Sequence, residues 1–130
     1  MSGVLLDTHT VLWATEEGAA RLSPAAKRHI ETGDCFFSCA SILEMAIKHS
    51  LGKLRLPKDL TVKEYVEFSI EKLRLIVLPI RVPESCLVSL LPYHHSDPFD
   101  RILIAQAKVN ELAILSRDSD FDGYDVERIW

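Results

Sequence analysis

Short apolar runs alternate along the chain with stretches in which apolar residues recur at helical spacing. The runs predict strands at 4–7, 35–38, 75–80 and 113–116, with a fifth at 126–130. Helical spacing predicts helices at 11–14, 25–32, 61–73, 83–91 and 98–112, and a further helix from Ser41 to Gly52. This alternation predicts an α/β fold: a single three-layer domain with a parallel four- or five-stranded sheet between helices.

Polar residues mark where several of these helices begin. The turn Thr8-His9-Thr10 is suited to cap the first helix, and Ser23-Pro24 reads as a cap followed by the first helical residue. Ser41 lies three residues before Glu44, which is the spacing of a capping box. Pro98 is a natural first residue for the helix that ends near Leu112.

Composition narrows the class of protein. With 130 residues and 48% hydrophobic content, the chain is long enough for one core, so we expect one domain over residues 1–130. No run reaches the roughly 18 apolar residues of a membrane span, and the start of the sequence lacks a basic region, so we expect a cytoplasmic protein with no membrane association. The odd set Cys35, Cys39 and Cys86 predicts buried free thiols. The net charge of -4 does not by itself indicate a nucleic-acid binder.

Carboxylates at the ends of the predicted strands are the strongest functional signal. Asp7 and Asp118 follow two apolar runs, and Glu44 and Asp100 lie in the helices between them. Parallel strands place their ligands just outside their carboxyl ends, so the four acids are expected to converge there. Such a group repels itself unless a cation is present, and a hard divalent ion is the usual occupant of an all-oxygen site.

Each acid also has a purely structural interpretation. Asp7 can cap the helix that follows it, and Glu44 can serve a capping box or pair with Lys48. Asp100 lies in the first turn of its helix, which favours an anion, although Asp97 is the better cap there. Asp118 can be an acid of a solvated turn; beside it, Ser116 and Arg117 form a polar strand end suited to a phosphate or a hydrated ion.

Taken in order, the motifs resemble a known family. They are Leu5-Leu6-Asp7-Thr8-His9, Ser38 to Lys48, Leu51 to Leu56, Leu91 to Arg101, Leu115-Ser116-Arg117-Asp118 and the terminal Trp130. Together they resemble the PIN-domain ribonucleases of the VapC type over essentially the whole chain. The family's four acids fall on Asp7, Glu44, Asp100 (rather than Asp97) and Asp118. Ser116 stands where the family often has threonine and keeps the hydroxyl.

The resemblance implies a metal-dependent endoribonuclease that is the toxin of a toxin–antitoxin pair. It implies Mg²⁺ or Mn²⁺ as cofactor, with Asp7 and Asp100 as direct or water-mediated ligands and Asp118 and Glu44 completing the site. Thr8, Ser116 and Arg117 are then supporting or substrate-binding residues. One or two such ions can activate a water and neutralise a phosphate, which agrees with the physical reading of the acids.

Basic residues and histidines add weaker indications. Candidates for contacts with RNA phosphates are Lys53, Arg55, Lys58 and Arg117, although each alone also fits a solvated surface. His94 and His95 are expected to lie in a loop and not to ligate metal, because a hard oxygen site does not need imidazole.

Two other classes of protein remain open. A phosphatase of the haloacid dehalogenase type also has an aspartate after its first strand, but its pattern has a second aspartate where this chain has His9. A catalytically inactive RNA- or protein-binding PIN-like domain would use the acids for structure alone. Metal binding and its loss in Asp7→Asn distinguish this second class from a nuclease.

The resemblance also implies a small antitoxin as partner. Apolar positions expected to meet it are Val11, Leu12 and Trp13, or Leu51, Leu54 and Leu56, beside an acidic pocket that a basic side chain of the antitoxin can enter. The alternative is that these residues belong to the core. A homodimer or a toxin–antitoxin hetero-oligomer would bury some of them.

Overall fold

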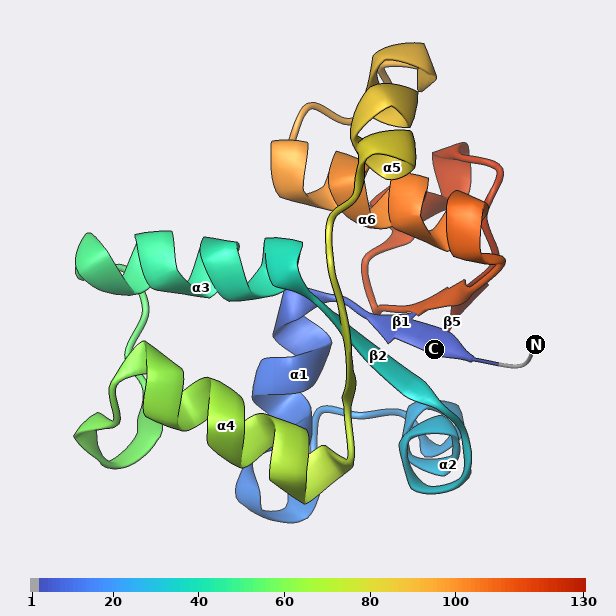
Figure 1. Cartoon of the computed structure of the whole chain (residues 1–130). Coiled ribbons are helices and arrows are strands. Elements are labelled where there is room, and N and C mark those ends of the chain that lie inside the picture. Colours follow the sequence, from blue (N-terminus) through green and yellow to red (C-terminus); the bar gives the residue numbers. More distant parts are fainter. Residues whose placement is uncertain (1–2) are drawn as a thin grey trace.

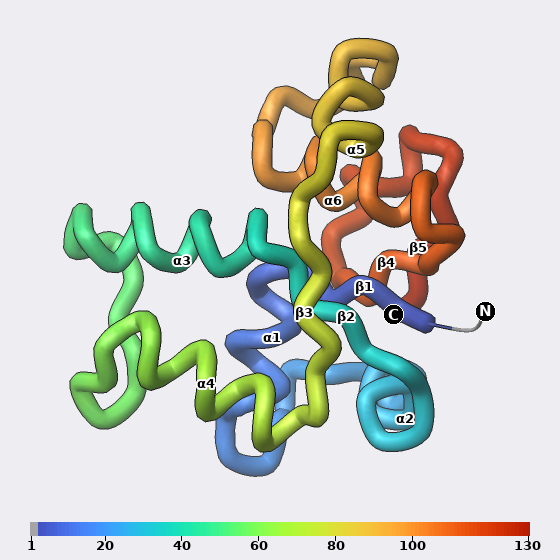
Figure 2. The backbone as a smooth tube through the Cα atoms, in the orientation of Figure 1, coloured from blue at the N-terminus to red at the C-terminus, as the bar shows by residue number. Residues whose placement is uncertain are grey.

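A five-stranded parallel sheet forms the centre of the molecule in the computed structural model, which describes residues 3–130 (Figure 1). The strands are β1 (Val4–Leu6), β2 (Cys35–Ser38), β3 (Ile76–Leu78), β4 (Ala113–Leu115) and β5 (Arg128–Ile129). Their order is β3-β2-β1-β4-β5, so the strand that comes first in the sequence lies in the middle (Figure 2). The predicted α/β class, the parallel sheet and the fifth strand are confirmed.

Helices cover both faces of this sheet. They are α1 (Thr8–Ala14), α2 (Pro24–Thr32), α3 (Cys39–Ser50), α4 (Val62–Leu73), α5 (Val82–Leu87) and α6 (Pro98–Asn110), with short 3₁₀ turns at Glu17–Ala19, Pro57–Asp59, Val88–Leu90 and Ser119–Gly123. In Figure 1, α1, α2 and α4 lie on one side of the strands and α5 and α6 on the other. The arrangement is the three-layer one predicted from the alternation of elements.

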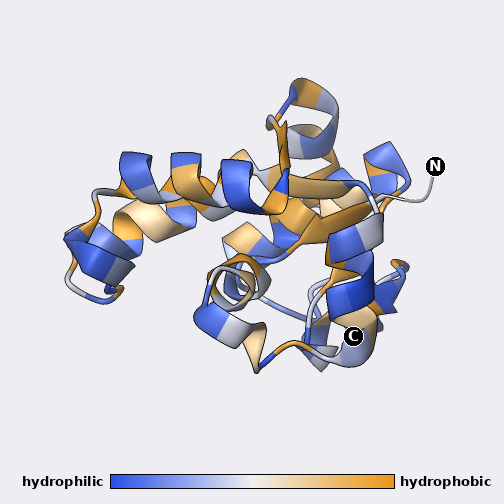
Figure 3. Ribbon diagram, turned by 90° about the horizontal axis from the view of Figure 1, so that it is seen from below, coloured by the Kyte–Doolittle hydropathy of each residue, from blue (hydrophilic) through white to orange (hydrophobic). Residues whose placement is uncertain are grey.

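Alternate residues of the central strand enter different cores. Val4 and Leu6 pack with buried residues of α1, α2 and α4, whereas Leu5 packs with residues of α6 on the other face. All three are almost inaccessible to solvent, which explains why a strand buried on both faces is a continuous apolar run. In Figure 3 the strands are accordingly coloured as hydrophobic, while polar residues occupy the outer sides of the helices.

Two of the predicted helix starts are wrong. The side chain of Asp7, and not the turn after it, caps α1 by accepting a hydrogen bond from the backbone N–H of Thr10. Ser38 caps α3 through the N–H of Ala40, so the helix begins before the expected capping box. Ser41 is buried inside α3, and its hydroxyl has no hydrogen-bond partner within residues 3–130.

Other boundaries follow the sequence more closely. Ser23 caps α2 and Pro98 is the first residue of α6, as predicted. The helix expected at 83–91 is a short α-helix followed by a separate 3₁₀ turn, and the third strand is shorter than predicted. All three cysteines are free thiols as predicted, but only Cys35 is buried; Cys39 is partly buried and Cys86 is exposed. Within residues 3–130 the structure has no helix with the length and apolar character of a membrane span.

The topology gathers several chain segments at one edge of the sheet. Because β1 to β5 are all parallel, their carboxyl ends share an edge, and α1 and α3 begin there. Helix α6 precedes β4 and runs back against it, so its first turn lies at the same edge. The four candidate acids belong to these segments.

Candidate active site

Asp7 stands at the end of the central strand with both carboxylate oxygens hydrogen-bonded. Its Oδ1 accepts from the backbone N–H of Thr10 at 2.8 Å and from the Thr10 hydroxyl at 2.6 Å. Its Oδ2 accepts from the hydroxyl of Ser116, the residue that follows β4. The structural interpretation of Asp7 as a helix cap is therefore correct, and these donors also fix the carboxylate at the edge of the sheet.

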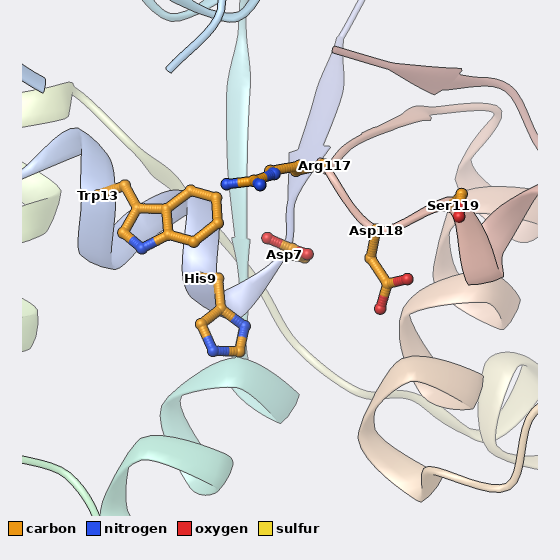
Figure 4. A pocket seen from close by; sticks show the side chains of 6 residues that line it. All are labelled: Asp7, His9, Trp13, Arg117, Asp118 and Ser119. Atoms are coloured by element: carbon orange, nitrogen blue, oxygen red, sulfur yellow. The ribbon is translucent and has the colours of Figure 1, made fainter. Parts of the chain in front are cut away.

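An open cavity of about 340 Å³ borders Asp7 (Figure 4). We call it the acid pocket; it is lined by Asp7, His9, Trp13, Arg117, Asp118 and Ser119. Asp7 is nearly buried, whereas His9, Arg117 and Asp118 are exposed. The pocket thus brings together two of the four predicted acids, with a guanidinium and two aromatic rings beside them.

Asp118 is held less firmly than Asp7. Its backbone N–H donates to the Ser116 hydroxyl at 3.0 Å, and its side chain accepts from the N–H of Asp120 at 2.9 Å. Ser116 therefore contacts both acids of the pocket: it donates to the side chain of Asp7 and accepts from the main chain of Asp118.

Glu44 is buried on α3 and hydrogen-bonded to Thr8, the residue that follows Asp7. Its Oε1 accepts from the Thr8 hydroxyl at 2.6 Å, and its Oε2 accepts from the Lys48 ammonium at 2.8 Å. The predicted ion pair with Lys48 is present, and the predicted capping box is not. Thr8, which the resemblance implies to be a supporting residue, connects Glu44 to the backbone beside Asp7.

Asp100 is the most electrostatically perturbed of the acids. Burial raises its pKa from 3.8 to about 6; the hydrogen bond from His95 lowers it, and the charges of Asp97 and Asp7 raise it. Repulsion by Asp97 and Asp7 thus contributes to the raised pKa of Asp100, but desolvation is its first cause. Asp97 caps α6 through the N–H groups of Phe99 and Asp100, so it is the cap, as anticipated.

The pKa of Lys48 is shifted by acids of two helices, α3 and α6. Its pKa is raised first by the hydrogen bond to Glu44, against the effect of burial, and further by the charges of Asp97 and Asp100. Asp7 in turn acts on Asp100. Lys48 therefore lies close to acids of both α3 and α6, and Asp7 lies close to Asp100.

His95 is a site residue that the sequence did not reveal. It lies in the loop before α6, as expected, and its Nε2 contacts Asp100 Oδ2 at 2.7 Å. The Asp100 charge and hydrogen bond raise the pKa of His95. The backbone N–H of His95 donates to the Tyr124 hydroxyl, and its carbonyl accepts from the buried Arg101. The sequence around His95 does not indicate either partner.

A second buried polar contact fixes the helices that carry the acids. The Ser38 hydroxyl donates to Gln106 Oε1 at 2.6 Å, and Gln106 Nε2 donates to the carbonyl of Pro79. Both side chains are fully buried. This contact ties the start of α3 to the middle of α6 and so sets where Glu44 and Asp100 lie.

The donor set fits a hydrated hard cation better than a closed cage. Within residues 3–130, no three acidic, histidine or cysteine side chains are close enough to hold one metal ion directly. Magnesium, however, keeps several waters and needs only one or two carboxylates. Burial, and after it the charges of Asp97 and Asp7, raise the pKa of Asp100, and a divalent ion beside this carboxylate would favour its ionised form.

Comparison with known families agrees with this geometry. The PIN domain model matches residues 4–127, and the chain belongs to the PIN domain family. PIN domains are generally nucleases, so membership supports a hydrolase that acts on nucleic acid. A search of curated proteins gives no match.

Solved structures share the fold. VapBC2 from Rickettsia felis bound to a promoter DNA fragment is similar with a TM-score of 0.73 at 10% identity, over 98% of each chain. FitAcB from Neisseria gonorrhoeae gives 0.62 at 20% identity, over 98% of this chain and 96% of that one. DNA-bound VapBC from Salmonella typhimurium gives 0.63 at 14% identity, over 99% and 98%. At these identities the likeness establishes the fold.

Proposed function

We propose that this protein is a Mg²⁺- or Mn²⁺-dependent endoribonuclease and the toxin of a toxin–antitoxin pair. The observation that carries the proposal is the acid pocket, where Asp7 and Asp118 lie beside Arg117 at the carboxyl edge of a PIN-type sheet. Glu44 and Asp100 lie at the same edge. We expect the protein to act in the cytoplasm.

The chain's own residues divide the work as follows. Asp7 and Asp100 would hold the ion directly or through water, and Asp118 and Glu44 would complete the site. Thr8 and Ser116 orient Glu44 and Asp7 through the hydrogen bonds described above. When bound, the ion would supply Lewis acidity and lower the pKa of the water that hydrolyses the phosphodiester.

Arg117 is the residue placed to receive the RNA phosphate. It is exposed, it lines the acid pocket, and it follows Ser116 directly. A guanidinium there offsets the repulsion between the acids and a polyanion. Arg55 and Lys58 border a different cavity, so we assign them no contact at the cleavage site.

We place the antitoxin in a larger groove between α1, the 57–59 turn and α4, here called the α1–α4 groove. Its volume is about 1240 Å³, and it is lined in part by Leu12, Trp13 and Leu54. Of the other expected positions, Leu56 is buried but also lines this groove, Val11 is a core residue, and Leu51 is exposed outside the groove. An amphipathic helix is the partner such a groove suits, since it buries one apolar face.

Exposed apolar residues of α3 offer a second surface, on which another copy of this chain or the antitoxin could pack. Leu43 and Ile47 on α3 and Leu51, the residue directly after the helix, follow one another at helical spacing and are all exposed. We expect either a homodimer or a hetero-oligomer with the antitoxin to cover such residues.

The two rival classes make different predictions. A haloacid dehalogenase-type phosphatase is disfavoured, because the PIN model covers the chain and His9 replaces the second aspartate. An inactive binding domain would keep its fold and partner without needing metal. Cleavage and metal binding therefore decide between it and the nuclease.

The test is expression of this chain with sequencing of cellular RNA ends. We expect growth arrest and new RNA ends with the wild type, and neither with Asp7→Asn or Glu44→Gln. Asp125→Asn is the matched control, because Asp125 is fully exposed and lies outside the site. Co-expression of the small reading frame adjacent to the gene should suppress the arrest, and its product should co-purify. A harmless wild type without new RNA ends would refute the proposal.

A further inference from the structure

Trp13 lines two cavities, the acid pocket and the α1–α4 groove. Its side chain lines the acid pocket together with Asp7 and Asp118, and it also lines the α1–α4 groove. It is partly exposed, so a ligand in either cavity can touch it. The proposed catalytic chemistry gives this indole no role.

The indole is held in place by its neighbours. Trp130 packs against it edge-on with ring centroids 5.9 Å apart. The guanidinium carbons of Arg21 and Arg117 each lie 5.8 Å from its centroid. A ring fixed in this way loses little freedom when a ligand stacks on it, which favours binding.

His9 extends the same aromatic surface into the acid pocket. It lies one helical turn before Trp13 on α1, and the two ring centroids are 5.8 Å apart at 42°. Figure 4 shows both side chains on the pocket side of α1, with Arg117 reaching toward the indole from the end of β4. The pocket therefore has acids on one wall and two rings with a guanidinium on the other.

This division matches the two parts of a nucleotide. Proteins bind unpaired bases by stacking them on aromatic rings and arginine planes, and they bind the phosphates with cations. The aromatic wall has few polar groups for reading base edges, whereas every base has a face that stacks. A duplex hides those faces inside its own stack, so the pocket suits a single strand.

We infer that His9 and Trp13 form a stacking wall for an unpaired nucleobase of the RNA, next to the phosphate that Arg117 binds. The inference rests on the proposed ribonuclease function and adds two substrate-positioning residues, His9 and Trp13. Because Trp13 lines both cavities, a base stacked on its indole and an antitoxin side chain in the α1–α4 groove would compete for the same ring.

The experiment measures binding of fluorescent single-stranded oligoribonucleotides to the full chain carrying Asp100→Asn. That change lies outside the acid pocket and is expected to stop cleavage. In this background we expect Trp13→Ala and His9→Ala to raise the Kd about 5- to 150-fold, which corresponds to the loss of one base–aromatic stack. Trp13→Tyr should restore most of the affinity, and His49→Ala, an exposed histidine at the end of α3, should leave it unchanged.

A base scan separates stacking from a general effect on folding. Oligonucleotides lacking one base at successive positions are compared on the parent and on Trp13→Ala. At one position we expect the missing base to weaken binding to the parent and to have no further effect on Trp13→Ala. If Trp13→Ala fails to fold, His9→Ala decides, because His9 is exposed and its removal does not disturb the core.

The outcomes separate this inference from the proposed function. Unchanged RNA affinity in His9→Ala and Trp13→Ala overturns the stacking wall, and cleavage by the wild type would still support the nuclease. If Trp13→Ala loses antitoxin binding but keeps its RNA affinity, as is expected for the groove variant Phe68→Ala, Trp13 belongs to the antitoxin site. That outcome also overturns the stacking wall. Base-dependent binding by a wild type that cleaves no RNA supports the wall and refutes the nuclease.

Discussion

Ser116 donates a hydrogen bond to Asp7 across 109 residues of sequence. The contact joins the ends of the neighbouring strands β1 and β4, and the same hydroxyl accepts from the N–H of Asp118. One fully buried side chain therefore positions both acids of the pocket.

Replacement of this serine tests that role. Ser116→Ala leaves an oxygen of Asp7 and the N–H of Asp118 without their partner, so we expect the free energy of unfolding to fall by about 1–3 kcal/mol. RNA cleavage should fall as well, since two acids lose their placement. Urea denaturation and a cleavage assay measure the two effects. Ser116→Thr keeps the hydroxyl and should retain most of both; an alanine variant equal to wild type would contradict the role.

Metal should stabilise the fold by binding it. At an ion concentration of about 100 Kd, linkage gives roughly 2.7 kcal/mol of additional stability. We expect a higher Tm for the wild type on adding Mg²⁺ or Mn²⁺, and little change for Asp7→Asn or Asp100→Asn. Asp125→Asn should respond like the wild type. Cleavage should stop with excess chelator, and activity that persists there would mean a metal-free mechanism.

The pH dependence follows from Asp100. Its pKa is raised to about 6, so the ionised form that binds a cation predominates above that pH and is lost as the pH falls through it. We expect the metal-induced rise in Tm, and cleavage at limiting Mg²⁺, to decrease on acidification with a midpoint near 6. A midpoint near 4 would show that Asp100 does not control the site.

His95 should shift this midpoint in a defined direction. Its hydrogen bond and charge lower the pKa of Asp100, so their removal raises that pKa. We therefore expect His95→Ala to move the acid limb of the activity profile to higher pH. His49→Ala is the comparison, and a limb that stays in place or moves to lower pH would contradict the assignment.

Gln106 is predicted to be a structural requirement of the site. Gln106→Leu removes the partners of the Ser38 hydroxyl and the Pro79 carbonyl, and we expect it to lower the free energy of unfolding by about 1–3 kcal/mol. Chemical denaturation measures this change, with Ser89→Ala as an exposed control. A loss no larger than that of the control would show that the contact is dispensable.

The layers of the fold are readable from the sequence because burial imposes them locally. Strands buried on both faces need runs such as Val4 to Leu6, and these occur at the expected places. The start of α3 was misplaced because Ser38 and Ser41 are both serines near the junction. The strand continues to Ser38 and the helix begins immediately, which leaves the second serine inside.

The sequence indicates Asp7 and Asp118 because they follow strands, but it does not indicate the partners of the acids. Glu44 and Lys48 are one helical turn apart, so their ion pair was anticipated. The contacts of Asp7 with Ser116 and of Ser38 with Gln106 join residues far apart in sequence, and no spacing rule links them. Nor does the pair of histidines before α6 indicate which one the loop turns toward Asp100.

The position of β1 has a consequence for how the pocket adapts. β1 is hydrogen-bonded on both sides, by β2 and β4, so its amides belong to the most protected part of the sheet. Asp7 sits directly on it, whereas Arg117, Asp118 and Ser119 are exposed and follow the end of β4. The pocket thus has a floor that the central strand fixes and a rim of three exposed residues. Changes in substrate preference can accumulate at the rim without disturbing the acid that anchors the chemistry.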